Sequence, residues 1–453
     1  MTALRRRLRR GPDDAGMTLV EVLVSMFIFA LLSTGIVYTM LSVLQVSRDA
    51  RARQVAANLA AQEIDLARDT QDLFALLDDD WTVQLNGDNF RVERSTQWVS
   101  DPGLDFSCGG GGPSGGALRY KRVNVTVTWE NMRPGTEPVR SDTVIDPNVR
   151  INDPTRGTIL VSVLNASGTG VAGVSVSASP SPGSTPADTD AQGCTYVLKA
   201  PPATYTVSVN EPGYRDGNQN PTATQTVTVA AGGSASAGFL YDRAATFTGQ
   251  LAPGYTPPAG TLRIPTGLKV TFWNTYGRYP RSADSGANTR TPNFILHPYP
   301  SGYQAFAGTC ERAEPSFWPA VPDPGGTLQS LPVEPVAAAP GGSATIPVPM
   351  GIVTIAGGGS GGGFLRADHV PTDPSDPACT TGQLQFGNVL TASPTTIALP
   401  YGTWRLYRST STTTTGGTQV GSGVLSTPTP AIPERTTVAT DGTITLDPRV
   451  VVP

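Results

Sequence analysis

Few side chains in this sequence could carry catalysis. Only two histidines occur, His297 and His369, and neither has a cluster of acids or cysteines beside it in the sequence. Histidine-based metal sites and serine–histidine–aspartate triads are therefore disfavoured. We identify no catalytic residue, and we expect no metal and no cofactor. Both histidines are expected to be surface or structural residues. An exported hydrolase built on an acid pair is a less favoured alternative that one sequence leaves open.

The four cysteines are widely spaced, and no two of them form a CxxC pair for redox chemistry or zinc. An even, dispersed set suits two disulfides in an exported chain. Cys310 and Cys379 could staple the segment between them, which would leave Cys108 to pair with Cys194. Four cysteines allow three pairings, and the sequence does not choose among them.

The N-terminus contains one acid in an unusual place. Residues 1–16 include five arginines, and residues 17–46 are apolar almost throughout, with Glu21 as the only charge. A helix over this stretch would be longer than a ~30 Å hydrocarbon layer, and no small-residue cleavage site follows it. The arginines predict a cytoplasmic N-terminus. A carboxylate in hydrocarbon costs about 2–3 kcal/mol, so Glu21 needs a partner.

Residues 16–25, GMTLVEVLVS, resemble the class III signal of type IV prepilins and pseudopilins. The resemblance implies that a prepilin peptidase cuts between Gly16 and Met17 and that Met17 is then N-methylated. It also implies that Glu21 pairs with the terminal amine of a neighbouring subunit during assembly. Met17 replaces the commoner phenylalanine. The helix lacks the kinking proline of many major pilins, which favours a minor pilin or pseudopilin.

The physical chemistry of Glu21 agrees with this resemblance. The carboxylate would lie about 6 Å along the helix from the new terminus. An amine of one chain and a carboxylate of the next can neutralise each other when helices stagger, and neither is stable alone in apolar surroundings. The alternative is a plain signal-anchor helix with an isolated acid near its cytoplasmic end.

The helical pattern continues through residues 47–77, which contain no glycine or proline. Apolar residues recur every seven positions with two flanking neighbours on the same face, namely Ala52, Leu59, Leu66 and Leu73 with Val55 and Leu77. This pattern predicts an amphipathic half-helix that packs on a β domain; a coiled-coil dimer is the alternative. The acidic run 78–80 should end the helix as a solvated turn, with a calcium site as the less favoured reading.

Alternating residues predict strands at 89–99, 118–130 and 139–146, with a glycine-rich loop at 109–116. A long helix followed by a small antiparallel sheet is the pilin-like arrangement, and it would cover residues 17–147.

Residues 155–243 contain short strands between glycine, proline and asparagine turns, which is typical of an all-β sandwich. The stretches 170–176, 190–196 and 201–207 resemble the carboxypeptidase regulatory-like, or transthyretin-like, domain. Ala203 stands where that family usually has glycine. The resemblance implies a non-catalytic spacer or binding module.

Residues 244–453 are rich in β patterns, and the stretch 398–406 echoes 200–207. We therefore expect a diverged second sandwich with an insertion at 276–394. Residues 357–363, GGGSGGG, lack the lysine and the following helix of a phosphate loop and are expected to form a flexible loop.

These observations predict an α+β protein, with a long N-terminal transmembrane and amphipathic helix, a small antiparallel sheet and all-β sandwich modules. The predicted segments are 1–16 (leader), 17–46 and 47–77 (helix halves), 78–147 (pilin-like β domain), 155–243 and 244–453. The predicted protein is held in the cytoplasmic membrane by one span and then assembled into an extracellular pilus or displayed at the cell surface. Its expected partners are prepilin peptidase, other pilin subunits and the membrane. The β modules would bind a ligand that the sequence does not identify, and no nucleic-acid site is evident. A membrane-anchored adhesin outside any filament is the alternative.

Overall fold

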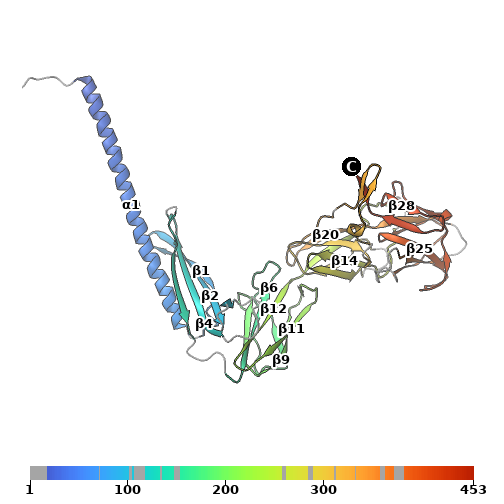
Figure 1. Cartoon of the computed structure of the whole chain (residues 1–453), viewed down its shortest axis with the longest axis horizontal. Coiled ribbons are helices and arrows are strands. Elements are labelled where there is room, and N and C mark those ends of the chain that lie inside the picture. The colour runs from blue at the N-terminus through green and yellow to red at the C-terminus, as the bar shows by residue number, and fades with distance from the viewer. Residues whose placement is uncertain are drawn as a thin grey trace, which may run out of the picture. The chain divides into compact units, whose positions relative to one another are not determined.

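The computed structural model describes residues 18–70, 72–100, 105–106, 118–132, 135–146, 154–257, 262–283, 289–310, 313–331, 333–357, 363–371 and 382–453. The predicted leader and most of both glycine-rich loops lie outside them. One long helix precedes a chain made almost entirely of strands, so the predicted α+β class is confirmed (Figure 1). The chain divides into two compact units. The first contains the helix and a sheet, and the second contains the strands from residue 157 onward.

Helix α1 runs over Leu19–Asp69. The chain after it bends because Thr70 is extended and its hydroxyl donates to the carbonyl of Leu66 at 3.1 Å. The predicted end at residue 77 was therefore wrong. Leu73 and Leu76 lie beyond the helix and are buried. Their carbonyls accept hydrogen bonds from the ammonium of Lys121, at 2.8 Å for Leu73, so the bend is fixed to the sheet.

The first unit contains an antiparallel sheet with the strand order β1-β2-β4-β5, and a short strand β3 pairs with β2. Asn86 and Gly87 both have positive φ, as the two-residue turn of the first hairpin requires. Alternate residues of β4 are buried, and the sheet packs against α1. The strands are β1 (Asp79–Leu85), β2 (Asp88–Ser100), β3 (Asp105–Phe106), β4 (Leu118–Trp129) and β5 (Val139–Ile145).

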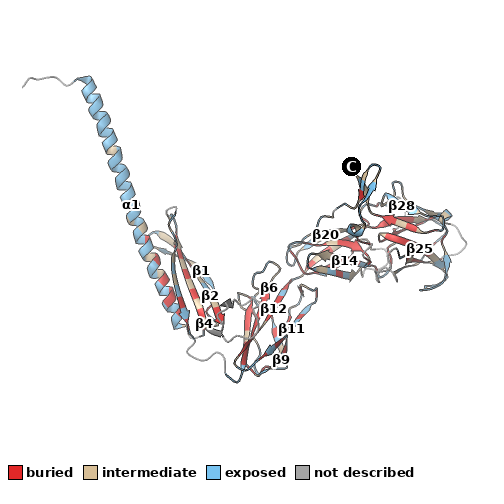
Figure 2. Ribbon diagram, viewed as in Figure 1, coloured by how far each residue is buried: buried red, intermediate tan, exposed pale blue. Residues whose placement is uncertain are grey.

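The buried residues of α1 lie along its lower half, beside the sheet (Figure 2), and most of them are alanines. Ala52 is the one helical residue of the predicted stripe that is buried. Leu66 is 58% exposed, and Leu59 and Val55 are only half-buried. The predicted stripe was therefore wrong about which residues face the sheet. Small side chains allow the helix backbone to approach the strands closely, and the leucines are displaced to the flank. The buried helix residues are Ala52, Ala56, Ala60, Glu63, Ile64 and Ala67.

Two sheets from residues 157–243 share one hydrophobic core, as an all-β sandwich requires. The first strand β6 and the last strand β12 pair in parallel, from Thr158 opposite Ser234 to Leu164 opposite Leu240. Gly170 touches the backbone of Gln192 so closely that a Cβ would come within 2.1 Å of it. The sheets have the orders β10-β12-β6-β8 and β11-β9-β7, with β6 (Gly157–Leu164), β7 (Val176–Ser179), β8 (Cys194–Ala200), β9 (Ala203–Asn210), β10 (Tyr214–Asp216), β11 (Thr222–Val229) and β12 (Ser234–Arg243).

Most of the remaining strands of the second unit surround two further cores. One core contains Phe247, Phe272 and Leu296, and the other contains Ile397 and Leu406. The first core uses strands β13 (Ala245–Leu251), β14 (Lys269–Asn274), β15 (Gly277–Ser282), β16 (Asn293–Leu296), β17 (Gln304–Ala307) and β20 (Ser343–Val348). The second uses β21 (Gly351–Ile355), β22 (Gly363–His369), β23 (Gln383–Leu390), β24 (Thr395–Leu399), β25 (Gly402–Ser409), β26 (Thr418–Gln419), β27 (Leu425–Ser426), β28 (Arg435–Val438) and β29 (Ile444–Asp447).

A small further sheet has the order β18-β19-β30, with β18 (Val321–Asp323), β19 (Gly326–Gln329) and β30 (Val450–Val452). The range 276–394, predicted as an insertion, thus supplies strands to both of the cores built from residues 245–447.

The echo between residues 200–207 and 398–406 has a structural counterpart. The Tyr205 hydroxyl donates to the carbonyl of Pro201 at 2.7 Å, and the Trp404 indole N–H donates to the carbonyl of Pro400 at 2.9 Å. In each case an aromatic residue near the start of a strand bonds to a proline four positions earlier. The reading of residues 244–453 as a diverged sandwich stays a prediction.

Candidate functional site: the N-terminal helix

The predicted processing residues, Gly16 and Met17, lie outside the described residues, and the description begins at Thr18. Glu21 lies in the first turn of α1 and is exposed. Thr18 is the N-cap, and its side-chain oxygen accepts from the Glu21 N–H at 3.4 Å. The sequence Thr18-Leu19-Val20-Glu21 therefore has the spacing of a capping box, in which an acid at the third helical position favours the helix start. Glu21 has this local structural role available in addition to any role in assembly.

In the part of the chain that the structure describes, no residue of the upper half of α1, residues 19–46, is buried. Its large apolar side chains are exposed; Leu19, for example, is 76% exposed and Tyr38 is 76% exposed. Among the described residues, α1 is the only helix that is long and apolar enough to cross a membrane, with a mean hydropathy of 2.2 in its most apolar window. Exposed apolar surface on this scale indicates contact with lipid or with other helices.

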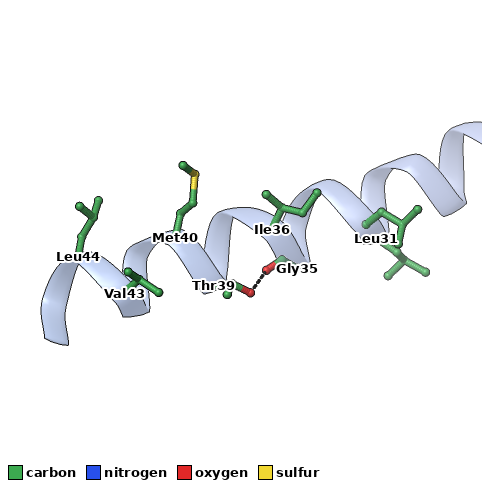
Figure 3. A pocket seen from close by; sticks show the side chains of 8 residues that line it. Leu31, Gly35, Ile36, Thr39, Met40, Val43 and Leu44 are labelled. Atoms are coloured by element: carbon green, nitrogen blue, oxygen red, sulfur yellow. Dashed lines mark hydrogen bonds between the residues drawn. The ribbon is translucent and has the colours of Figure 1, made fainter. Parts of the chain in front are cut away.

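Three hydroxyl groups in this half bond to the helix's own backbone. Ser25 donates to the carbonyl of Val22 at 2.9 Å, and Thr34 donates to that of Ala30 at 2.7 Å. Figure 3 shows the third case, in which Thr39 donates to the carbonyl of Gly35 at 2.7 Å between larger apolar side chains. Because hydrocarbon offers no hydrogen-bond partners, such internal bonds make an otherwise polar side chain compatible with it.

The lower half of α1 is fixed to the sheet by charged residues that the sequence analysis missed. Glu63 is buried, and its carboxylate accepts from the Arg94 guanidinium of β2 at 2.5 Å. Arg94 also donates to the carbonyl of Leu77 at 2.8 Å and lies 3.5 Å from Asp79. One weak signal in the sequence was available, since Glu63 lies on the same helix face as Ala52, Ala56, Ala60 and Ala67. Its partner, 31 positions away, has no such signal.

The three carboxylates of the acidic run 78–80 each contact a residue of strand β2. The Asp78 carboxylate accepts from the backbone N–H of Thr96 at 2.6 Å, Asp79 faces Arg94, and Asp80 pairs with Arg91. The Arg91 hydrogen bond lowers the pKa of Asp80 below its usual value. The three carboxylates thus point at three different partners, and no group of three metal-ligating residues occurs in the part of the chain that the structure describes.

The two histidines lie in the second unit and are buried. His297 is 0% exposed, with Nδ1 at 3.0 Å from the carbonyl of Arg215, and burial lowers the pKa of its imidazole. His369 packs edge-on against Trp404, with ring centroids 5.0 Å apart. Both are therefore interior residues. Of the two positions expected from the sequence, surface or structural, the structure has the second for both histidines.

Cys194 and Cys310 are disulfide-bonded. Cys108 and Cys379 lie outside the described residues, so the connectivity stays a prediction.

Residues 12–37 match the family model for the prokaryotic N-terminal methylation motif. The chain therefore carries this motif, which is the class III signal, and the matched residues include Glu21 and the start of α1. The match covers the N-terminal segment only, and no curated protein sequence matches the chain.

Three solved structures show weak likeness to the chain. The TIE protein of Bacillus anthracis is 11% identical, with 76% of this chain and 72% of that chain covered and a TM-score of 0.19. A streptococcal ancillary pilin is 10% identical, with 56% and 92% covered and a TM-score of 0.18. The major pilin subunit of Bacillus cereus is 12% identical, with 66% and 96% covered and a TM-score of 0.19. Scores this low carry no argument about fold or function.

Proposed function

We propose that this chain is a minor pilin or pseudopilin, a structural subunit rather than an enzyme. Prepilin peptidase removes residues 1–16, Met17 becomes the N-methylated terminus, and the subunit enters a type IV pilus-like filament through packing of α1. The observation that carries this proposal is the methylation motif at the start of a helix whose upper half has no buried residue among those described. The β modules are then displayed outside the membrane, where they are available to bind a surface ligand.

Glu21 provides the electrostatic step of assembly in this proposal. Its carboxylate is one turn from the new terminus, in a helix segment whose other side chains carry no charge. Pairing with the amine of an adjacent subunit removes two isolated charges from apolar surroundings and sets one register between neighbouring helices. Partner subunits include copies of this chain or other pilins.

Mass spectrometry of the protein isolated from its own host tests the processing step. The expected terminus is N-methyl-Met17. A mature protein that retains Met1 in a host with active prepilin peptidase would refute the proposal and leave a membrane-anchored adhesin. The capping box at Thr18 and Glu21 specifically favours that second candidate, because it gives Glu21 a purpose in an unprocessed anchor.

Two substitutions at Glu21 separate assembly from capping. Glu21→Gln keeps a side chain that can serve a capping box but removes the charge, whereas Glu21→Ala removes both. We expect both variants to insert in the membrane and both to fall at least tenfold in filament incorporation, measured by immunoblot of sheared filaments. If Glu21→Gln assembles at the wild-type level, the charge pairing is wrong and the acid serves only the helix start.

A further inference from the structure

The outer face of the first sheet contains a polar hollow. Thr143 of β5 accepts from the Arg68 guanidinium of α1 at 2.9 Å, so its side chain faces the helix. Successive side chains of a strand point to opposite faces, so Asp142 and Val144 lie on the face turned away from α1. The hollow on that face has a volume of about 780 Å³. Its polar lining comes from β2, β4 and β5, namely from Ser95, Arg122, Asn124, Thr126, Arg140 and Asp142.

Strand pairing brings these side chains together. In the register of β4 with β5, Asn124 is opposite Asp142 and Thr126 is opposite Arg140. Strand β2, which contributes Ser95, lies on the other side of β4. Directly opposite residues on one sheet face have Cβ atoms about 5 Å apart. A guanidinium, a carboxylate, an amide and a hydroxyl group therefore lie within reach of one small molecule.

The chain itself leaves most of these polar groups unused. In the described ranges, five of the lining side chains form no hydrogen bond or ion pair with another residue, namely those of Ser95, Asn124, Thr126, Arg140 and Asp142. Arg140 and Asp142 have opposite charges and lie two positions apart on one strand, yet they do not pair with each other. By contrast, Arg91, which is also exposed on this sheet, pairs with Asp80. The hollow thus offers donors and acceptors to a ligand.

The kinds of lining group favour a saccharide that carries a carboxylate. A guanidinium such as that of Arg140 binds a carboxylate through two parallel hydrogen bonds. The Asp142 carboxylate accepts hydrogen bonds, and the Asn124 amide both donates and accepts them, which suits the hydroxyl groups of a sugar. Val144, which is 55% exposed, is the apolar residue of the lining and offers a contact to the C–H groups of a sugar ring.

The same lining disfavours nucleic acids and apolar peptides. No aromatic side chain occurs among the described residues that line the hollow, so bases have no surface on which to stack. Two arginines against one aspartate leave a single net positive charge, and the Asp142 carboxylate would repel a phosphate backbone. An apolar peptide would meet only Val144.

We propose that this hollow binds an acidic saccharide, with Arg140 holding its carboxylate and Asp142 accepting from its hydroxyl groups. The proposal rests on the proposed function in one respect, because display outside the membrane is what exposes the site to extracellular saccharides. It assigns ligand binding to the sheet of the first unit, where the sequence analysis expected an unidentified ligand on the β modules in general.

NMR saturation-transfer titrations of the full chain in detergent test the site. The probes are galacturonic acid, glucuronic acid and N-acetylneuraminic acid, with galactose and glucose as neutral sugars and acetate as a carboxylate without a sugar. We expect at least one acidic sugar to bind more tightly than every neutral sugar and than acetate. Arg140→Gln should lower its affinity about tenfold, because the variant loses a charge-assisted pair of hydrogen bonds.

Two further variants separate a saccharide site from a simple anion site. Asp142→Ala should lower the affinity for the acidic sugar about threefold, since the sugar hydroxyls lose an acceptor. A site for bare anions would instead gain affinity, because the variant removes a negative charge. Arg91→Gln is the matched control, an exposed arginine of the same sheet outside the lining, and it should leave the affinity unchanged.

Several outcomes would overturn the proposal. These are no binding of any acidic sugar, equal binding of acetate, a gain of affinity in Asp142→Ala, or equal losses in Arg91→Gln and Arg140→Gln. Binding of duplex DNA that depends on Arg140, without binding of any sugar, would also overturn it and assign the hollow to nucleic acid. Failure of these titrations leaves the processing of Met17 and the role of Glu21 untouched, whereas a retained Met1 refutes the proposed function without changing sugar binding.

Discussion

The two halves of α1 form one continuous helix, but the upper half is exposed and the lower half packs on the sheet. Residues 19–46 are mostly large, apolar and exposed, and three of their hydroxyl groups bond to the helix's own carbonyls. Residues 47–69 present alanines and one buried acid to a sheet, with charges on the outer side. The upper half is therefore shaped for contacts outside its own chain, and the lower half is shaped mainly to hold the β domain. Substitutions that affect folding should cluster in the lower half.

The largest effect is expected at the buried ion pair. Glu63→Ala leaves Arg94 without its closest carboxylate, and breaking a buried pair on one side costs about 3 kcal/mol or more of unfolding free energy. Hydrogen exchange of peptides covering residues 52–67 in detergent-solubilised protein measures this loss. Asp65→Ala is the matched control, since that side chain is 77% exposed and its removal should change stability by less than about 0.5 kcal/mol. Equal exchange in the two variants would contradict the role assigned to Glu63.

Overpacking the alanine face should have the next largest effect. Ala56 is 0% exposed against the sheet, so Ala56→Leu should destabilise the contact by about 1–3 kcal/mol. The neighbouring Ala57 is exposed, and Ala57→Leu should leave the thermal unfolding midpoint of the first unit nearly unchanged. If both leucines are tolerated, the helix does not depend on small residues for its close approach.

Acidification should lower the stability of the second unit more than that of the first, because both histidines lie in the second unit. Burial lowers the pKa of His297, despite Asp242 and Asp216 nearby, so the unfolded chain binds the proton more readily than the folded one. Stability of the second unit is then fully present above the unfolded pKa of ~6.5 and falls as the pH drops below it. Denaturation at pH 7 and pH 5 should show this loss, and His297→Asn should reduce it, while exchange of residues 52–67 shows no such histidine-linked change. A wild-type second unit that is equally stable at both values would rule out His297 as the sensitive group.

The smallest effect on folding is expected in the upper half. Leu31 is 59% exposed and lies outside every described core, so Leu31→Ala should change the unfolding free energy by less than about 0.5 kcal/mol. The same change removes apolar surface that the proposed assembly would bury, so filament incorporation should fall while folding does not. A large loss of stability would mean that the upper half packs on its own chain after all.

The features that could be predicted from the sequence are those that depend on local residue patterns. An apolar stretch with one acid defined the helix and its motif, and alternation placed strands in the first sheet close to where they lie. The contacts that decide which helix face is buried are non-local. Glu63 and Arg94 are 31 positions apart, and Lys121 reaches carbonyls 45 and 48 positions away, so neither contact has a signature in the sequence. The leucine stripe predicted the wrong buried face for a related reason. Its seven-residue spacing does not reveal that alanines allow the helix to approach the sheet more closely than leucines do.

The parallel pairing of β6 with β12 determines how the first β module would respond to a mechanical load. These are the entering and leaving strands of the module, and they lie side by side over seven matched residues. Tension applied through the two ends would draw the strands past each other lengthwise, so their cross-strand hydrogen bonds must yield together instead of one after another. A module whose first and last strands are paired in this way resists unfolding under a pull applied through its two ends.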